Sequence, residues 1–237
     1  MTGQMVRVSP SRVAAVPDLR PRMPAPKRGW LIPGGDELFR SVYTGFQVGA
    51  PTSFAVCSAV SGDGKTTLSL GLALTFAQDL PDRRVVVVET DLWRPVLAQD
   101  FGLEPAPGLV DALLDRVPTH EILRPTSLDN LSLVVAGSAA GSAQRLLRSS
   151  RMPQVMDELR HMHDVVIVDT PATLAHSEVS LLARMVDDVV FVVRTGVTPA
   201  HDLASALGRL QGAKIRGIVV NDARSSVPNW VRRLVRL

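Results

Sequence analysis

The stretch SFAVCSAVSGDGKTT, residues 53–67, decides the fold of this chain. An apolar, β-prone run, Phe54–Cys57, leads into a loop of small residues that closes with Gly62–Lys65, and a helix-forming stretch follows. In that order, loop amides and a helix N-terminus point at an anion, and the lysine adds a positive charge. A hydroxyl directly after the lysine, here Thr66, can ligate Mg²⁺. The stretch therefore predicts a loop that binds the phosphates of a nucleotide.

The loop departs from the usual phosphate-binding pattern, G-x-x-x-x-G-K-[ST], because Ala59 stands at the first glycine. One alternative is a plain turn between a strand and a helix. A second is a dinucleotide loop, but its G-x-G-x-x-G pattern needs a third glycine and has no use for a lysine. The phosphate-binding interpretation accounts for the order strand, loop, lysine, threonine and helix. The residues expected to contact the nucleotide are Ser61, Gly62, Asp63, Gly64, Lys65, Thr66 and Thr67.

Length and composition favour one sizeable α/β domain with a tail, or at most two small domains. The chain has 237 residues, of which 46% are hydrophobic, and a net charge of +3. The single cysteine, Cys57, excludes an internal disulfide and favours a reducing compartment. No stretch approaches the roughly 18 apolar residues that span a membrane, and we expect no secretory signal. An aromatic content of 4% argues against base stacking on nucleic acid.

The ends of the chain are basic. Residues 1–33 combine six prolines with scattered arginines and are predicted to form a flexible arm, which leaves 34–237 as the nucleotide-binding domain. Contact of the arm with a membrane surface or a partner is an alternative. Residues 36–46 are predicted to be helical. The tail from Trp230 onward alternates apolar and arginine residues, and it could lie on an anionic bilayer, dock on a partner, or form a helix packed on the domain.

Strands and helices alternate along the rest of the chain. The expected strands are Phe54–Ala59, Val85–Glu89, Leu131–Ala136, Val165–Asp169, Val189–Val193 and Ile218–Asn221. The expected helices are Thr66–Gln78, Gly108–Leu114, Ala143–Arg160, Ser177–Met185 and Pro199–Leu210. Continuous Val/Ile runs are typical of strands covered on both faces. The pattern predicts a doubly wound, mostly parallel sheet with helices on both faces and the ligand at the carboxyl ends of the strands.

Carboxylates follow two of the valine-rich strands. Glu89 and Asp91 end the run that begins at Val85, and Asp169 ends the run that begins at Val165. An acid at a strand end beside a phosphate-binding loop is well placed to hold Mg²⁺, directly or through water. A helix cap or a solvated loop end is the alternative for any one of them. Together with Thr66, Asp91 and Asp169 are the predicted metal ligands.

These motifs resemble the cytoplasmic domain of the bacterial tyrosine kinases, P-loop relatives of the Par/Min ATPases, over about residues 34–222. In that family the first motif (Walker A) includes G-[ED]-G-K-[ST], which 62–66 matches. The second (Walker A′) is D-x-D-x-R, for which 89–93 reads ETDLW, and the third (Walker B) is D-[ST]-[AP]-P, for which 169–172 reads DTPA. Val60 stands where Par/Min ATPases carry a second lysine, which favours the kinase branch.

The resemblance implies the doubly wound P-loop fold, ATP and Mg²⁺ as ligands, and phosphoryl transfer to tyrosine in the regulation of polysaccharide synthesis and export. It implies that Lys65 bridges the phosphates, that Glu89 is the general base in place of the family's Asp, and that Asn221 contacts adenine, although Asn221 could equally be a turn residue. Lys65, Glu89, Asp91 and Asp169 are thus the predicted catalytic residues. A membrane-embedded co-polymerase is the implied partner, the implied location is the cytoplasm at the inner membrane face, and a homo-oligomer is implied.

Two departures from the family keep other functions open. The oligomerisation motif E-x-x-R-x-x-R is matched by Glu37 and Arg40, but Tyr43 replaces its last arginine. Tyr43 is also the one tyrosine of the chain, so the family's C-terminal tyrosine cluster is missing. An ATP-driven oligomerisation switch without kinase activity is therefore one alternative. A Par/Min-type positioning ATPase is another, but scattered arginines are weak support for specific binding to nucleic acid.

Overall fold

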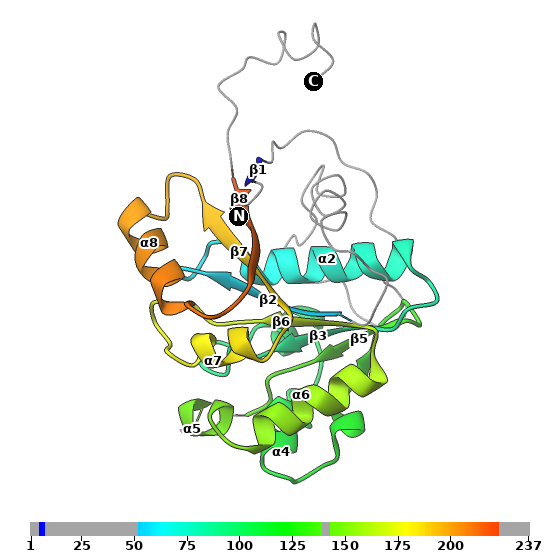
Figure 1. The fold of residues 1–237 in the computed structure, drawn as a ribbon. Coiled ribbons are helices and arrows are strands. Elements are labelled where there is room, and N and C mark those ends of the chain that lie inside the picture. Colours follow the sequence, from blue (N-terminus) through cyan, green and yellow to red (C-terminus); the bar gives the residue numbers. More distant parts are fainter. Residues whose placement is uncertain (1–4, 8–51, 139–142, 223–237) are drawn as a thin grey trace, which may run out of the picture.

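A single sheet of eight strands forms the centre of the structure, a computed structural model that describes residues 5–7, 52–138 and 143–222 (Figure 1). The strands, in sheet order, are β1 (Met5–Arg7), β8 (Ile215–Asn221), β7 (Asp188–Arg194), β2 (Thr52–Ser58), β6 (Val165–Asp169), β3 (Val85–Glu89), β5 (Leu131–Val134) and β4 (Arg124–Pro125). Neighbours run parallel except β4 and β5. The doubly wound, mostly parallel sheet is thus confirmed.

Helices cover both faces of the sheet (Figure 1). They are α2 (Lys65–Asp79), α3 (Leu97–Phe101), α4 (Leu109–Leu113), the short 3-10 helix η1 (Thr119–Ile122), α5 (Ala143–Leu147), α6 (Arg151–Met162), α7 (Val179–Arg184) and α8 (Ala200–Arg209). The apolar core is split accordingly. One part lies under α2 and α3, and the other lies under α4, α5, α6, α7 and α8.

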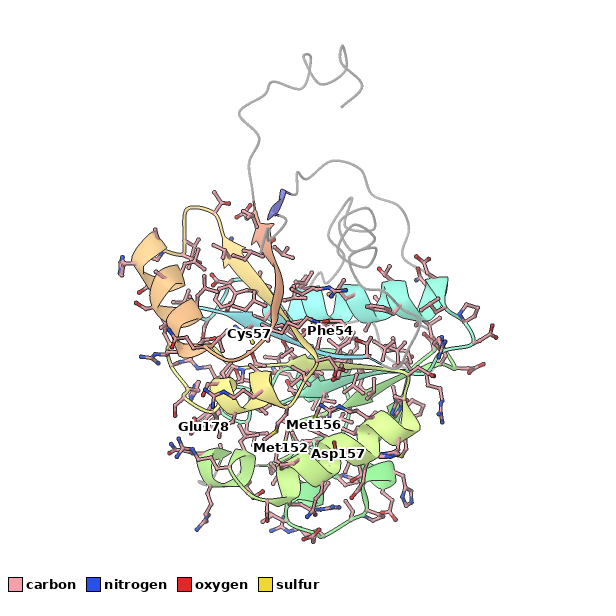
Figure 2. All side chains as sticks on the ribbon, viewed as in Figure 1. Phe54, Cys57, Met152, Met156, Asp157 and Glu178 are labelled. Atoms are coloured by element: carbon pink, nitrogen blue, oxygen red, sulfur yellow. The ribbon has the colours of Figure 1, made fainter. Side chains whose placement is uncertain are left out.

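The valine-rich strands are buried because the core lies on both of their faces. In β2, Phe54 belongs to the core beneath α2, whereas Cys57 belongs to the core on the α6 side, where Met152 and Met156 also pack (Figure 2). All four side chains are at most 1% exposed. Burial raises the pKa of Cys57 to about 12, so the thiol stays protonated at neutral pH and behaves as a small apolar side chain.

The segment expected to form one helix over Ala143–Arg160 forms two, α5 and α6. The break follows from Pro153, which has no backbone N–H and would crowd the carbonyl of Ser149 in a continuous helix. Proline is tolerated in the first turn, and α6 begins at Arg151, two residues earlier. Ser149 instead turns its hydroxyl onto the Leu146 carbonyl at 2.7 Å. Pro153 was therefore the sequence signal for the break.

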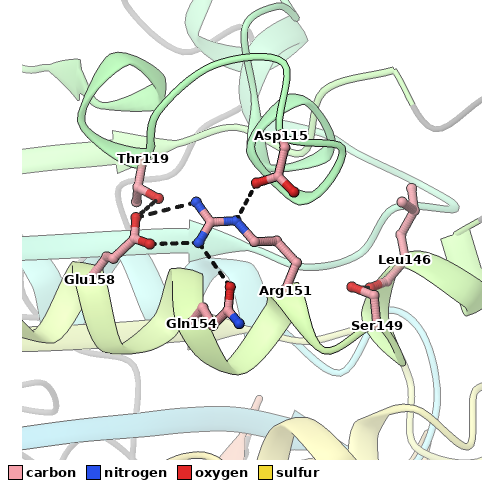
Figure 3. Close-up of polar contacts among 7 residues, drawn as sticks. All are labelled: Asp115, Thr119, Leu146, Ser149, Arg151, Gln154 and Glu158. Carbon is pink, nitrogen blue, oxygen red and sulfur yellow. Dashed lines mark hydrogen bonds and ion pairs between the residues drawn. The ribbon is translucent and has the colours of Figure 1, made fainter.

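Arg151 ties the start of α6 to the segment between α4 and η1 (Figure 3). Its guanidinium lies 2.8 Å from a carboxylate oxygen of Asp115 and donates to Glu158 at 2.6 Å. The Thr119 hydroxyl donates to the other oxygen of Glu158. The hydrogen bond from Arg151 lowers the pKa of Glu158. These contacts fasten the first half of α6 to Asp115 and Thr119, in the segment that follows α4.

A pH dependence of stability is expected from His163, at the end of α6. Its side chain is 6% exposed, and burial lowers its pKa, while the Leu159 carbonyl 3.1 Å from Nδ1 opposes the shift. The unfolded chain therefore binds the proton more tightly than the folded chain, so stability is retained above about pH 6.5 and falls as the pH drops below it. In urea unfolding, the wild type should lose more free energy between pH 7.5 and 5.5 than His163→Gln. The exposed neighbour variant His161→Gln should follow the wild type, and equal losses in all three would contradict the expectation.

Several expectations fall outside the described residues. They are the helix at 36–46, the arm at 1–33 apart from its residues 5–7 in β1, and the tail after Trp230. The division into an arm and a domain stays a prediction. In the described part of the chain, no helix combines the length and apolar character needed to cross a bilayer.

Candidate active site

The predicted phosphate loop connects β2 to α2 at the carboxyl edge of the sheet. Its glycines are required by the backbone, because Gly62 has φ +89° and Gly64 has φ +103°, values that side chains disfavour. Packing also excludes any larger residue at Gly64, since a Cβ there would lie 2.3 Å from Nδ2 of Asn221. Ser61 and Gly62 are exposed, so the mouth of the loop is open to solvent. Thr67 lies half-buried in the first turn of α2.

Lys65 points back into the loop. Its side chain is 8% exposed, and its Nζ donates to Oγ of Ser58 at 2.9 Å. The Ser58 hydroxyl in turn donates a hydrogen bond to the carbonyl of Val60 at 2.7 Å. The described contacts thus give the ammonium a hydroxyl oxygen rather than a carboxylate as its hydrogen-bond partner. A positive charge held this way is available to an anion that enters the loop.

Asp169 and Thr66 meet at the start of α2. The Thr66 hydroxyl donates to Asp169 Oδ2 at 2.6 Å, and the Ser69 hydroxyl donates to Oδ1 at 3.1 Å. Asp169 is 2% exposed, and burial raises its pKa to about 7, although the Thr66 hydrogen bond and the charge of Lys65 oppose the shift. A buried carboxyl with so few hydrogen-bond donors favours a cation as a further partner.

The donor set fits Mg²⁺ better than a transition metal. In the described residues there is no group of three or more His, Cys, Asp or Glu side chains suited to hold a metal ion. Mg²⁺ in nucleotide sites needs no such cage, because one or two protein oxygens, the phosphates and water complete its shell. The hydroxyl of Thr66 and the carboxylate of Asp169 are oxygen ligands of this kind, already in contact at 2.6 Å.

Asp91 lies in the loop after β3. Its Oδ1 accepts the backbone N–H of Trp93 at 3.2 Å and of Arg94 at 3.0 Å. The Trp93 ring stacks on His176, in the loop after β6, with ring centroids 3.9 Å apart. This stack joins the loops that follow the second and third motifs, and it uses the tryptophan that replaces the arginine of the family pattern.

Glu89 is held by backbone groups. Oε1 accepts the N–H groups of Val96 at 2.5 Å and Leu97 at 2.9 Å, and Oε2 accepts the N–H of Ala136 at 3.0 Å. The residue is 1% exposed and lies beside Asp169 across β3 and β6. Burial raises the pKa of Glu89, and the three N–H groups oppose that shift. Glu89 therefore fixes the N-terminus of α3, as the helix-cap alternative for this acid allows, and also the end of the β5 segment.

Asp63 and Asn221 contact each other from the loop and from the end of β8. Asp63 is fully buried, and its carbonyl accepts Nδ2 of Asn221 at 2.8 Å. Oδ1 of Asn221 accepts the N–H of Asp222 at 2.9 Å. The structure thus brings Asn221 to the loop, while its contact with adenine stays a prediction.

Sequence reasoning missed three side chains at this site, Ser58, Ser69 and Thr198. A signal existed for two of them. Ser58 ends the strand before the loop, and Ser69 lies three residues after Thr66, on the same face of α2. Thr198 lies in the connection between β7 and α8, 135 residues from its partner Asp63, and nothing local marks it.

No protein-family model matches the sequence. Among curated proteins, the chain is similar to bacterial tyrosine kinases. It is 29% identical to the tyrosine-protein kinase YwqD of Bacillus subtilis over 176 residues, which cover 73% of each chain. It is 28% identical to the tyrosine-protein kinase ptk of Acinetobacter johnsonii over 165 residues, which cover 69% of this chain. The match spans only 22% of the Acinetobacter protein.

Solved structures show the same fold. The kinase domain of the Escherichia coli tyrosine kinase ETK superposes with a TM-score of 0.74 at 24% identity, covering 82% of this chain and 78% of that one. The VpsO kinase domain gives a TM-score of 0.69 at 27% identity, and the superposition covers 80% of this chain and 98% of the VpsO domain. The septum site-determining protein MinD of Pyrococcus horikoshii, complexed with Mg-ADP, superposes with a TM-score of 0.58 at 20% identity. The superposition covers 78% of this chain and 76% of MinD. The shared architecture is that of P-loop nucleotide-binding proteins.

Proposed function

We propose that this chain, a homologue of the bacterial tyrosine kinases with a P-loop fold, binds Mg-ATP and transfers the γ-phosphoryl group to a tyrosine hydroxyl of a protein. The observation that carries the proposal is the convergence of Lys65, Thr66 and Asp169 at one edge of the sheet, with Lys65 and Asp169 buried and Thr66 hydrogen-bonded to Asp169. Homology to tyrosine kinases supports the reaction, and the fold supports the nucleotide.

A protein catalyses phosphoryl transfer mainly by positioning the reacting groups and by neutralising the charge of the phosphates. In the proposed complex, the backbone N–H groups of 62–67 surround the phosphates, and Lys65 turns from Ser58 to the β- and γ-phosphates. Mg²⁺, when bound, neutralises phosphate charge. Thr66 and Asp169 would hold it, with Asp91 as a further ligand. Binding of a cation would also favour the ionised form of Asp169, whose pKa burial raises to about 7.

The proton of the attacking hydroxyl needs an acceptor, and Glu89 stands at the position that the family resemblance gives to the general base. Its oxygens accept three backbone N–H groups. In the proposal Glu89 therefore also acts as a positioning residue, because it holds the loop that carries Asp91.

The acceptor tyrosine and the partner belong to the proposal as well. The only tyrosine of the chain is Tyr43, which lies outside the described residues. We propose that a membrane-embedded polysaccharide co-polymerase supplies or presents the acceptor at the cytoplasmic face of the membrane. The proposed role is control of capsule or exopolysaccharide synthesis, and self-association and a peripheral contact of the basic ends with the membrane form part of it. Specific binding to nucleic acid does not.

The test is incubation of the full chain with γ-labelled ATP and Mg²⁺, alone and with a tyrosine-containing co-polymerase, followed by phosphoamino-acid analysis. Label on tyrosine, either at Tyr43 or on the co-polymerase, is the expected result. Label found only as free phosphate would contradict kinase activity and favour the ATP-driven switch. Lack of nucleotide binding would overturn the proposal entirely.

A further inference from the structure

Asp63 occupies the middle of the phosphate loop, yet its side chain is fully buried and turned away from the open mouth formed by Ser61 and Gly62. Its Oδ1 accepts the hydroxyl of Thr198 at 2.6 Å. Its Oδ2 accepts the backbone N–H of Val60 at 3.4 Å, a longer contact inside the loop itself. The carboxylate therefore connects the first half of the loop to a distant segment of the chain.

A second contact from outside the loop reaches the same residue. Nδ2 of Asn221, at the end of β8, donates to the carbonyl of Asp63 at 2.8 Å. Asn221 also fills the space beside Gly64, which leaves no room for a Cβ there. Asp63, which directly precedes Gly64 and its positive φ, is thus held by side chains from β8 and from the connection between β7 and α8.

The segment that carries Thr198 is itself fixed. Thr198 precedes α8, and at the other end of α8 the Arg209 guanidinium donates to the carbonyls of Thr173 at 3.2 Å and Leu174 at 2.8 Å. The N–H groups of Thr173 and Leu174 in turn donate to the carbonyls of Ser58 and Ala59, at 2.9 and 3.1 Å, just before the loop. Both ends of α8 are therefore linked to the phosphate loop.

From these contacts we infer that Thr198 and Asn221 are positioning residues that hold the phosphate loop in its binding shape through Asp63, so that the β7–α8 connection sets nucleotide affinity. The inference deepens the proposed function and rests on it. An anion-binding loop needs its N–H groups aligned before the ligand arrives, and an unsupported loop loses conformational freedom on binding, which weakens affinity. The carboxylate–hydroxyl bond at 2.6 Å is of the charge-assisted kind, the strongest class available for such support.

The test uses the full chain and calorimetric titration with Mg-ADP. Thr198→Val keeps the shape of the side chain and removes the donor, and it is expected to raise the Kd about tenfold, as the loss of one hydrogen bond to a charged group predicts. Thr198→Ser restores the hydroxyl and should bind within about twofold of the wild type. The matched control is Thr195→Val, an exposed threonine of the same connection, which should bind like the wild type.

A double-mutant cycle separates positioning from a general structural effect. In an Asp63→Ala background, Thr198→Val should weaken binding no further, because its partner is already missing. The inference would be overturned if the Kd increases of Thr198→Val and Asp63→Ala multiplied in the double variant. It would also be overturned if Thr198→Val left the Kd unchanged, or if Thr198→Ser raised the Kd as much as Thr198→Val. If Thr198→Val does not fold, Thr198→Ala removes the same donor and takes its place. Failure of the wild type itself to bind Mg-ADP would overturn the proposed function, and with it this inference.

Discussion

Replacing Lys65 by alanine is expected to lower the rate of phosphoryl transfer from ATP about 10²–10³-fold, as removal of one preorganised electrostatic donor does elsewhere. Lys65 is 8% exposed, and its ammonium donates to the Ser58 hydroxyl at 2.9 Å, so its charge is held in place before ATP arrives. Such a group is worth most where charge develops in the transition state. The measurement is the initial rate of γ-phosphate transfer at saturating Mg-ATP.

The chain offers a matched control in Lys214, an exposed lysine at the amino end of β8, on the edge of the sheet opposite the phosphate loop. Lys214→Ala should transfer phosphate at the wild-type rate. A Lys65→Ala rate that equals the control would contradict the assignment of the whole site, because no other residue of the loop carries a positive charge.

Replacing Glu89 by glutamine is expected to lower the free energy of unfolding by about 1–3 kcal/mol. Glutamine has one carbonyl oxygen, which can accept the N–H groups of Val96 and Leu97, but its NH₂ group would then face the N–H of Ala136. A buried donor without an acceptor costs its desolvation. Transfer should fall as well, because the loop that carries Asp91 runs from Glu89 to Val96 and Leu97, whose N–H groups Glu89 accepts. Urea unfolding at constant pH measures the first effect, and the transfer rate measures the second.

The same variant separates the two roles of Glu89. A residue that acts only as a general base would lose transfer with no change in unfolding free energy, while a purely structural residue would lose stability with transfer unchanged at temperatures where the variant is folded. The exposed Glu104→Gln serves as the control and should alter neither quantity. An unchanged unfolding free energy in Glu89→Gln would show that the three N–H contacts contribute nothing to stability.

The sheet was predictable because its signal is local. Val85–Glu89 and Val165–Asp169 have the bounds expected from the sequence, since each is a continuous run of β-branched residues that ends in an acid. The break at Pro153 was readable in principle, since proline marks a first helical turn. The short α3, which begins at Leu97, could not be predicted from its own residues. The N–H groups at its N-terminus are accepted by the side chain of Glu89, at the end of β3.

The candidate site, like the fold, has contacts that the sequence predicted and contacts that it did not. The order of Lys65, Thr66 and the acids along the chain predicted which residues converge, since the carboxyl ends of parallel strands share one edge of the sheet. The contact of Thr66 with Asp169, 103 residues apart, agrees with that expectation. The partners of Asp63 and Glu89 were not predictable, because a carboxylate accepts any nearby N–H or hydroxyl.

The sequence by itself determined the phosphate loop, the parallel sheet and the edge at which the acids gather, because hydrophobic runs and glycine conformations are properties of a few neighbouring residues. Only the tertiary structure decided that Glu89 holds backbone N–H groups, that Trp93 stacks on His176, and that Thr198 reaches Asp63. Those contacts join segments far apart in the chain, and they exist only after packing has excluded water and left each buried polar group to the partner within reach.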